Sequence, residues 1–371
     1  MTDHSNETTG ATTSRPETLR ERFVATMTYN PVDGVQLPCL FQCFEAETIR
    51  RWQREGLPRD VHLAQHFGFD QIELAPVNLG PIPAGDLADA EDALEWRIGT
   101  DREHAEETAE AASRVKETFL LADDENWPEV QRRLNPDSPA RYPRFWDDYV
   151  AWKQDRDYPL GIALNGPFTW LRDWLGIHAF ANAFDQKQSW LQEIVEYTTD
   201  FTIRAAERAA RDLRPDFAIV RERGAYRAAS VAVPYNLGLF LKPAYRKISD
   251  FLASHGIEVR LVEAVGHCSA MLQFWVDSGL NGLYFAEAAA GLDARLLRLK
   301  YGADLAIIGN IDTQRLIAGR REIREELQSK VPVLCDEGGY IPCPDRPVPS
   351  EVALEDYEYY LAELSRILER G

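Results

Sequence analysis

Apolar and polar residues follow two different periods along this chain, and the two periods alternate. Short apolar runs at 259–262, 283–285 and 305–308 are each followed by a longer stretch in which apolar residues recur every three or four positions. The short runs are typical of buried strands, and the longer stretches predict amphipathic helices. Further strands are predicted at residues 35–44, 71–79, 94–100, 159–166, 215–220 and 331–334.

Alternating strands and helices predict a parallel sheet, because each helix returns the chain to the same edge. No Gly-rich dinucleotide motif follows the first predicted strand, so a closed (β/α)8 TIM barrel is favoured over a doubly wound sheet. Residues 1–17 are polar and poor in aromatic residues, which predicts a disordered tail. A helical extension, LRERFVATM, follows that tail, and no linker interrupts the rest. We therefore predict a single barrel domain over residues 18–371.

Titratable and metal-binding side chains follow several of the predicted strands. In a (β/α)8 barrel the carboxyl ends of the strands meet at one mouth, where the active site lies. Carboxylates at that mouth are candidates for acid–base catalysis, and arginines present a fork suited to a carboxylate or phosphate. The predicted catalytic residues are Glu222, Glu263, Glu287 and His267, and the residues predicted to bind a small anionic substrate include Arg221, Arg223 and Tyr226.

Most of these residues also have a purely structural interpretation. Glu263 could form a salt bridge between neighbouring strand ends, and the charges from Arg221 to Arg223 could pair with one another. Tyr226 could pack in the core. His267 and Cys268 could begin a helix, with the thiol turned inward. The sequence leaves both interpretations open.

Composition narrows the class of protein. The formal net charge is −19, which disfavours nucleic acid as a partner because phosphates would be repelled over most of the surface. No apolar run approaches the roughly 18 residues of a membrane helix, and no secretion signal is legible. The five cysteines form no CxxC pair, which indicates reduced thiols. We expect a cytoplasmic protein without a membrane partner; monomer and homodimer both remain open.

Six motifs occur in a characteristic order: GPFT at 166–169, RERGAY at 221–226, AVGHCS at 264–269, NGLYFAE at 281–287, YGADLAIIGNIDTQRL at 301–316 and EGGYIPCPDRPVP at 337–349. In these motifs the chain resembles the uroporphyrinogen decarboxylase-like superfamily over nearly its whole length from residue 18. That superfamily includes uroporphyrinogen decarboxylases, zinc-dependent methyltransferases that act with corrinoid proteins, and cobalamin-independent methionine synthase. The resemblance implies a (β/α)8 barrel.

The sequence departs from the decarboxylase pattern at several positions. The first predicted strand lacks the expected arginine motif, and Pro76 and Val77 stand near the expected acid of the second strand. Asp173 or Trp174 takes the place of a tyrosine after GPFT, and Arg346 that of a histidine in the last loop. A porphyrinogen is therefore disfavoured as the substrate. The resemblance still implies that Tyr340 and Arg346, in the loop that closes the pocket, bind substrate.

The methyltransferase branch binds zinc through a His-x-Cys pair and a later cysteine, which align here with Glu263, Val265 and Gly338. Zinc accepts cysteine, histidine and carboxylate ligands, and suitable side chains lie a few residues away. Neighbouring side chains diverge, so at most one of His267 and Cys268 is expected to bind directly. The predicted zinc ligands are His267, Cys268, Glu287 and Cys335.

Three functions follow from these observations. The first is methyl or one-carbon transfer to or from a small substrate, assisted by zinc and by a corrinoid protein as partner. The second is decarboxylation of a carboxylated substrate without a cofactor, with Glu222 or Glu287 protonating the carbanion. The third is a non-catalytic barrel that binds a ligand or docks a corrinoid protein.

Overall fold

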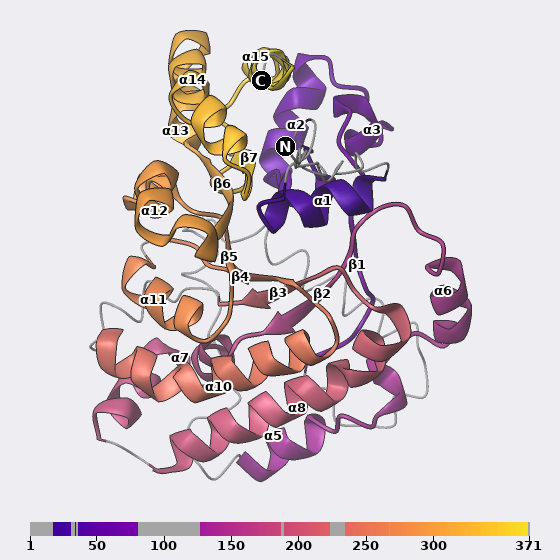
Figure 1. The fold of residues 1–371 in the computed structure, drawn as a ribbon, viewed down its shortest axis with the longest axis vertical. Coiled ribbons are helices and arrows are strands. Elements are labelled where there is room, and N and C mark those ends of the chain that lie inside the picture. The colour runs from indigo at the N-terminus through magenta and orange to yellow at the C-terminus, as the bar shows by residue number, and fades with distance from the viewer. Residues whose placement is uncertain are drawn as a thin grey trace, which may run out of the picture.

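The computed structural model describes residues 18–30, 34, 36–80, 127–186, 189–222, 234–266 and 268–369. Its centre is a sheet of seven parallel strands, whose order in space is their order in the sequence (Figure 1). The strands are β1 (Glu73–Leu74), β2 (Leu160–Asn165), β3 (Phe217–Arg221), β4 (Val259–Glu263), β5 (Gly282–Tyr284), β6 (Ala306–Ile311) and β7 (Tyr340–Pro344).

Helices connect the strands, as the alternating periods predicted. The helices are α1 (Leu19–Met27), α2 (Ala46–Glu55), α3 (Leu63–Phe67), α5 (Trp127–Arg133), α6 (Trp146–Trp152), α7 (Pro167–Asp185), α8 (Ser189–Leu213), α10 (Pro234–Ser254), α11 (Ser269–Asp277), α12 (Ala294–Tyr301), α13 (Thr313–Ala318), α14 (Arg320–Asp336) and α15 (Leu354–Leu368).

The segment 36–45 lies between the two outer strands of the sheet. Pro38 forms a parallel bridge with Asp70, just before β1, and Phe44 forms one with Val348, just after β7. A strand was predicted here, but Cys39–Phe41 forms a 3-10 turn. Pro38, with φ of −64°, sets that turn, because its ring fixes φ. The described residues therefore form seven strands of a barrel-like sheet and not the eight of a complete barrel.

The strand predicted at 331–334 is wrong. These residues lie inside α14, where Ile323, Leu327, Val331 and Leu334 are all buried. Their spacing is that of one face of a helix, and Val333 between them is 56% exposed. A four-residue apolar run fits either structure, and here the helix period decides. The strand predicted at 94–100 lies outside the described residues, as does the tail 1–17.

Strand β7 was not predicted, because its sequence YIPCP contains two prolines. Proline has no amide hydrogen to donate and is tolerated at the edge of a sheet. Strand β7 is such an edge, since β6 is its only partner within the sheet. Pro342 and Pro344 therefore fit a position that a central strand would not allow.

Side chains alternate between the inside and the outside of the curled sheet. One cluster fills the inside and includes Phe217, Leu261, Tyr284, Ile308 and Cys343. Helix α1 closes the end at which the strands begin, where it inserts Phe23 and Met27 into the same cluster. Side chains thus fill the inside of the sheet at the end where the strands begin. A site is therefore expected at the carboxyl ends of the strands.

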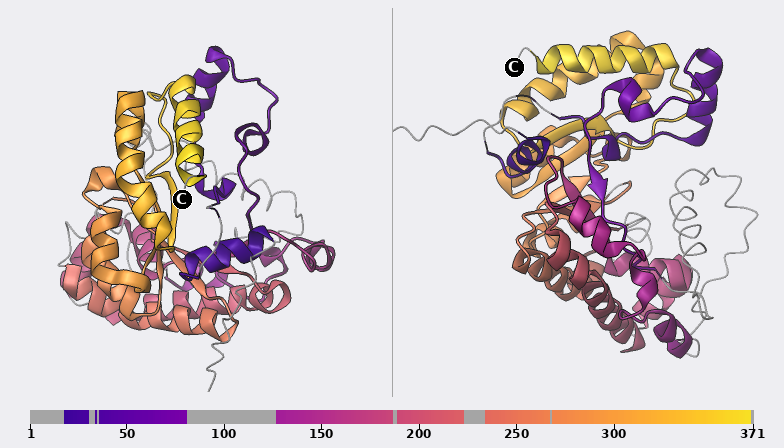
Figure 2. Two further views of the ribbon diagram at one scale, coloured as in Figure 1. Left: turned by 45° about the horizontal axis from the view of Figure 1, so that its top comes forward. Right: turned by 90° about the vertical axis from the view of Figure 1, so that its right-hand side faces the viewer.

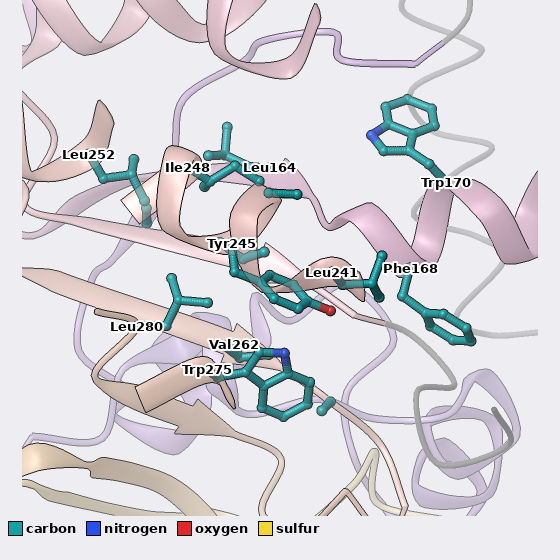
Figure 3. Packing of buried hydrophobic residues seen from close by; sticks show 14 of the residues in the cluster. Leu164, Phe168, Trp170, Leu241, Tyr245, Ile248, Leu252, Val262, Trp275 and Leu280 are labelled. Carbon is teal, nitrogen blue, oxygen red and sulfur yellow. The ribbon is translucent and has the colours of Figure 1, made fainter. Parts of the chain in front are cut away.

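The outside of the sheet is covered by helices. Helices α7, α8 and α10 lie side by side in Figure 1 and pack on the central strands. Figure 3 shows the centre of this layer, with Tyr245 and Trp275 among aliphatic side chains of the strands and helices. Their rings meet at 6.3 Å with an interplanar angle of 89°. This layer fixes the strands from behind.

A third cluster joins the two ends of the chain. Trp52 of α2 packs with Tyr357 of α15, at a ring distance of 4.8 Å. Helices α14 and α15 pack against each other, and both views of Figure 2 place the purple helices α2 and α3 on the same side of the molecule as these two. The N-terminal segment is thus held by the last third of the chain.

We predict that Gly161→Ala destabilises the protein by about 1–3 kcal/mol, the usual cost of overpacking. A Cβ at Gly161 would lie 2.4 Å from ring carbons of Phe217. Phe217 cannot move freely, because it is fully buried against Phe23, 5.2 Å away between ring centroids. Urea denaturation measures the loss. Phe217→Leu should recover part of it in the double variant, and purely additive losses would contradict this explanation.

Candidate active site

Arg221 and Glu263 are paired at the ends of two neighbouring strands. They are register partners on β3 and β4, and Arg221 Nε lies 3.3 Å from Glu263 Oε2. Glu263 is 4% exposed, so its charge needs this partner inside the protein. The salt bridge considered as the structural interpretation of Glu263 is therefore present, and it also places Arg221 at the mouth of the sheet.

Tyr284 and Cys43 lie beside this ion pair. Tyr284 is the register partner of Glu263 on β5, and its hydroxyl is 3.5 Å from Cys43 Sγ. Burial raises the pKa of Cys43 to about 11, and the nearby Glu263 adds to the shift. Burial likewise raises the pKa of Tyr284 well above its ordinary value. Both groups are thus protonated at neutral pH and act as neutral hydrogen-bonding groups.

Glu287 follows β5 and is half-buried at the same mouth. Its Oε2 accepts a hydrogen bond of 2.6 Å from the backbone amide of Gly266, which follows β4. Burial raises the pKa of Glu287, and the charge of Asp345 raises it further. The Gly266 amide and Arg346 oppose this shift. Glu287 therefore combines solvent access with a proton affinity above that of a free glutamate, which suits acid–base catalysis.

Arg346 and Asp345 follow β7 and complete the mouth. Arg346 Nε donates to Thr313 Oγ1 at 2.7 Å, and its charge lowers the pKa of Glu287. Asp345 is fully buried, and burial raises its pKa. Arg346 thus places a half-buried cation near a carboxyl group that can carry a proton.

Glu222 has a structural position in this protein. Its side chain is fully buried, and its carboxylate accepts hydrogen bonds from the amides of Phe168 (3.3 Å) and Thr169 (3.1 Å). These amides begin α7, where free N–H groups and the helix dipole stabilise a negative charge. Gly166 is required beside it, because a Cβ there would lie 2.2 Å from Glu222 Oε1. Glu222, which directly follows β3, therefore caps the N-terminus of α7.

Two predicted residues lie at the opposite end of the sheet. Cys335 belongs to α14 and follows no strand, so the reason for placing it at the mouth was wrong. It lies close enough to Arg298 and Tyr340 to interact with them electrostatically, near the start of β7. Tyr340 is the first residue of β7, fully buried, and its hydroxyl donates to the carbonyl of Gly309 at 3.0 Å. Cys335 and Tyr340 thus lie near the start of β7, whereas Glu287 follows the end of β5.

Cys268 lies near Glu287 but within the apolar core. It is 1% exposed at the N-cap of α11, and burial raises its pKa to about 12. Its thiol therefore packs inward, as its structural interpretation proposed. Three further predicted site residues lie outside the described part of the chain: His267, Arg223 and Tyr226.

A catalytic zinc ion needs three protein ligands. Among the described residues, no three histidine, cysteine, aspartate or glutamate side chains are grouped so that they could hold a metal. Of the predicted ligands that are described, only Glu287 combines a position at the mouth with an ionisable, partly exposed group. The described residues therefore do not fit a zinc site by themselves.

Sequence reasoning gave no functional role to four residues of this region. Cys43 and Tyr284 were placed within predicted strands, and Asn310 among the polar residues at the strand ends that form the mouth, without a role of its own. Asp345 was placed in the loop that closes the pocket, beside Tyr340 and Arg346, but was given no role because β7 was not predicted as a strand. Once YIPCP is read as an edge strand, the aspartate that follows it stands directly after a strand end, as Glu222 does after β3. That position was the available signal.

Comparison with known proteins finds a similar fold in a solved structure but no related sequence. No protein-family profile and no curated protein sequence matches this chain. A methyltransferase from Methanosarcina mazei has a similar structure, with 17% identity and a TM-score of 0.55, over 94% of this chain and 98% of that one. At this identity the similarity supports a common fold. It agrees with the resemblance to the uroporphyrinogen decarboxylase-like superfamily, and membership stays a prediction.

A second solved structure is a B12-independent methionine synthase from a Shewanella species in complex with selenomethionine. It shares 16% identity and a TM-score of 0.38, over 61% of this chain and 66% of that one. This similarity is too low to carry an argument. In the described ranges, no helix is both long and apolar enough to cross a membrane.

The position of Glu222 predicts a pH dependence of stability. Burial raises its pKa from 4.5 to about 7, against the opposing contacts with Tyr245 and the α7 amides. The folded state then binds a proton that the unfolded state has released, so the free energy of unfolding falls as pH rises through this window. The fall should be on the order of 3 kcal/mol.

Urea denaturation between pH 5 and 8 tests this prediction. The free energy of unfolding of Glu222→Gln should lack this fall. Relative to the wild type, the variant should therefore become more stable as pH rises. Glu196→Gln, at an exposed position of α8, is the matched control. A constant offset between Glu222→Gln and the wild type at every pH would refute the role of Glu222.

Proposed function

We propose that this protein is an enzyme that transfers a methyl or one-carbon group to or from a small anionic substrate. The substrate would bind at the carboxyl ends of β3 to β7. The observation that carries the proposal is Glu287, a half-buried carboxyl group with a raised pKa that lies within the influence of Arg346. The methyltransferase from Methanosarcina mazei, which has the same kind of fold, supports the choice of reaction.

Arg346 supplies the charge for binding. Its guanidinium group can hold a carboxylate of the substrate while Nε remains bonded to Thr313. Arg221 offers a second guanidinium group that is held in place by Glu263. Because Arg221 is partly neutralised by that partner, Arg346 contributes more to binding an anion.

Glu287 would carry the proton. In transfer to a thiol or amine, the nucleophile forms a bond to the methyl carbon while the bond from that carbon to the donor breaks. The proton of the nucleophile passes to the Glu287 carboxylate, and the electron pair leaves with the donor. A raised pKa makes Glu287 a better base, and burial limits the water that competes with it.

The proposed reaction steps do not depend on zinc or on a corrinoid partner, although either could take part. A zinc ion would lower the pKa of a bound thiol. It would need His267 beside Glu287, because the described residues supply no group of three ligands. The steps above are therefore assigned to Glu287 and the arginines. A corrinoid protein would present the methyl group at the mouth of the sheet.

Decarboxylation is the alternative that the same observation favours. A carboxyl group with a raised pKa, such as Glu287, can donate its proton to the carbanion left by loss of carbon dioxide. Arg346 would hold a second carboxylate of the substrate. Glu222 is unsuited to this role because it is fully buried against α7. The two reactions differ in their product, which is methylated in one and shortened by carbon dioxide in the other.

Glu287→Gln tests the proposed function. Removal of the proton carrier should lower kcat by roughly 10²- to 10⁴-fold, the usual contribution of acid–base catalysis, with a smaller effect on KM. Loss of the methyl group from methylcobalamin in the presence of small thiols, and carbon dioxide release from small dicarboxylates, measure the two reactions. Glu337→Gln, at the opposite end of the sheet beside Arg298, is the control. An unchanged kcat in Glu287→Gln would exclude Glu287 as the proton carrier.

Metal analysis tests the zinc addition separately. If zinc binds at the mouth, its affinity should fall by roughly 10-fold or more in His267→Ala and in Glu287→Gln, which each remove a ligand. Cys335→Ser should leave zinc binding unchanged, because Cys335 lies near the start of β7. Zinc that is lost in Cys335→Ser would contradict the structure of this region.

A further inference from the structure

We propose that Asn310 and Asp345 are positioning residues that hold the loop 285–292, and with it Glu287, in its reactive place. This inference rests on the proposed role of Glu287 in catalysis. Asn310 belongs to β6 and Asp345 directly follows β7, so neither residue belongs to the loop. Both are fully buried. Their hydrogen bonds reach the backbone on either side of Glu287.

Asn310 fastens both ends of the loop. Its Nδ2 donates to the carbonyls of Ala286 (2.7 Å) and Leu292 (2.8 Å), and its Oδ1 accepts from the amide of Ala294 (2.9 Å). All three polar contacts of the side chain go to the backbone of residues 286–294. A side chain that both donates and accepts is needed, since aspartate could not donate to the two carbonyls.

The backbone at both strand ends has unusual geometry. Phe285 has a φ of 67° and Asn310 a φ of 66°, in the left-handed region that side chains other than glycine rarely adopt. Lys330, a buried residue of α14, donates to the carbonyl of Asn310 at 2.6 Å and pairs with Glu326. Strained residues at a strand end persist where surrounding contacts fix them, and they concentrate at functional sites.

Asp345 fastens the middle of the loop. Its Oδ2 accepts from the amides of Ala288 (2.9 Å) and Ala289 (3.4 Å), which directly follow Glu287. Its Oδ1 accepts from Thr313, at 3.2 Å from the amide and 3.0 Å from the hydroxyl. The Glu287 carboxylate itself is held by Gly266. Glu287 is therefore fixed from three neighbouring strand ends at once.

Asp345 also sets the charge around Glu287. The titratable or charged groups that face Glu287 in the described structure are Asp345, Arg346 and the thiol of Cys268. Of the two charged residues, Asp345 opposes ionisation of Glu287 and Arg346 favours it. Loss of the Asp345 charge should therefore lower the pKa of Glu287, an effect that a merely structural residue would not produce.

Two variants test the clamp: Asn310→Gly changes the contacts alone, and Asp345→Asn removes a charge and weakens the contacts. Asp345→Asn removes the negative charge and leaves one oxygen to accept from the loop. Asn310→Gly removes the side-chain clamp while glycine still adopts the observed φ. Asp312→Asn is the matched control, because Asp312 also follows β6 but bonds to the amide of Gln314 in α13. Carboxyl NMR of labelled glutamate, assigned with Glu287→Gln, and amide hydrogen exchange provide readouts that need no substrate.

In Asp345→Asn we expect the Glu287 titration to move to lower pH and the amides of Ala288 and Ala289 to exchange roughly tenfold faster. In Asn310→Gly we expect faster exchange from 286 to 292 with little change in the titration. Asp312→Asn should change neither. With an active substrate, both positioning variants should lower kcat more than they raise KM.

The inference is overturned if the Glu287 titration and the loop exchange stay at wild-type values in the folded variants. If Asp345→Asn does not fold, Thr313→Val takes its place, because it removes one of the four hydrogen bonds to Asp345 and should speed exchange at Ala288. An unchanged exchange rate there counts against the clamp. If Glu287→Gln keeps full activity while these shifts occur, the clamp stands and the proposed function fails.

Discussion

The backbone ladder of the sheet continues past the ends of the strands, and the arrangement of the mouth depends on it. The amide of Gly166 donates to Arg221, that of Glu222 to Glu263, and that of Asp345 to Ile311. The residue that follows each of these strands is thus still hydrogen-bonded to the adjacent strand. Parallel strands in register place the next side chains at a common height. The backbone at the mouth therefore continues the hydrogen bonding of the sheet, and this fixes the positions of the side chains there.

Buried carboxylates around this mouth are stabilised in three different ways. Glu263 has an arginine, Glu222 has the first amides of a helix, and Asp345 has the amides of two turns. Each arrangement offsets the cost of removing a charge from water. Glu287 differs from these because it is only half-buried and accepts one backbone hydrogen bond. It is therefore the carboxyl group that can exchange a proton with a bound molecule.

The sequence predicted the central strands well because β2, β3, β4, β5 and β6 contain apolar runs between helices with clear periods. The positions of Arg221, Glu263 and Glu287 at strand ends followed from those runs. The last part of the chain was harder to interpret. A helical face was taken for a strand at 331–334, and the prolines hid β7, so Cys335 was expected where Asp345 lies. Burial, which decides the roles of Glu222 and Cys268, depends on contacts that no local pattern records.

The position of α1 has a consequence for folding during synthesis. This helix packs Phe23 and Met27 against β3 to β7, the carbonyl of Thr26 accepts from the amide of Gly339, and Arg20 pairs with Asp216. None of these partners exists when the helix leaves the ribosome. Helix α1 must therefore wait for β3 to β7 to be synthesised before it docks, so its attachment is a late step of folding on the ribosome.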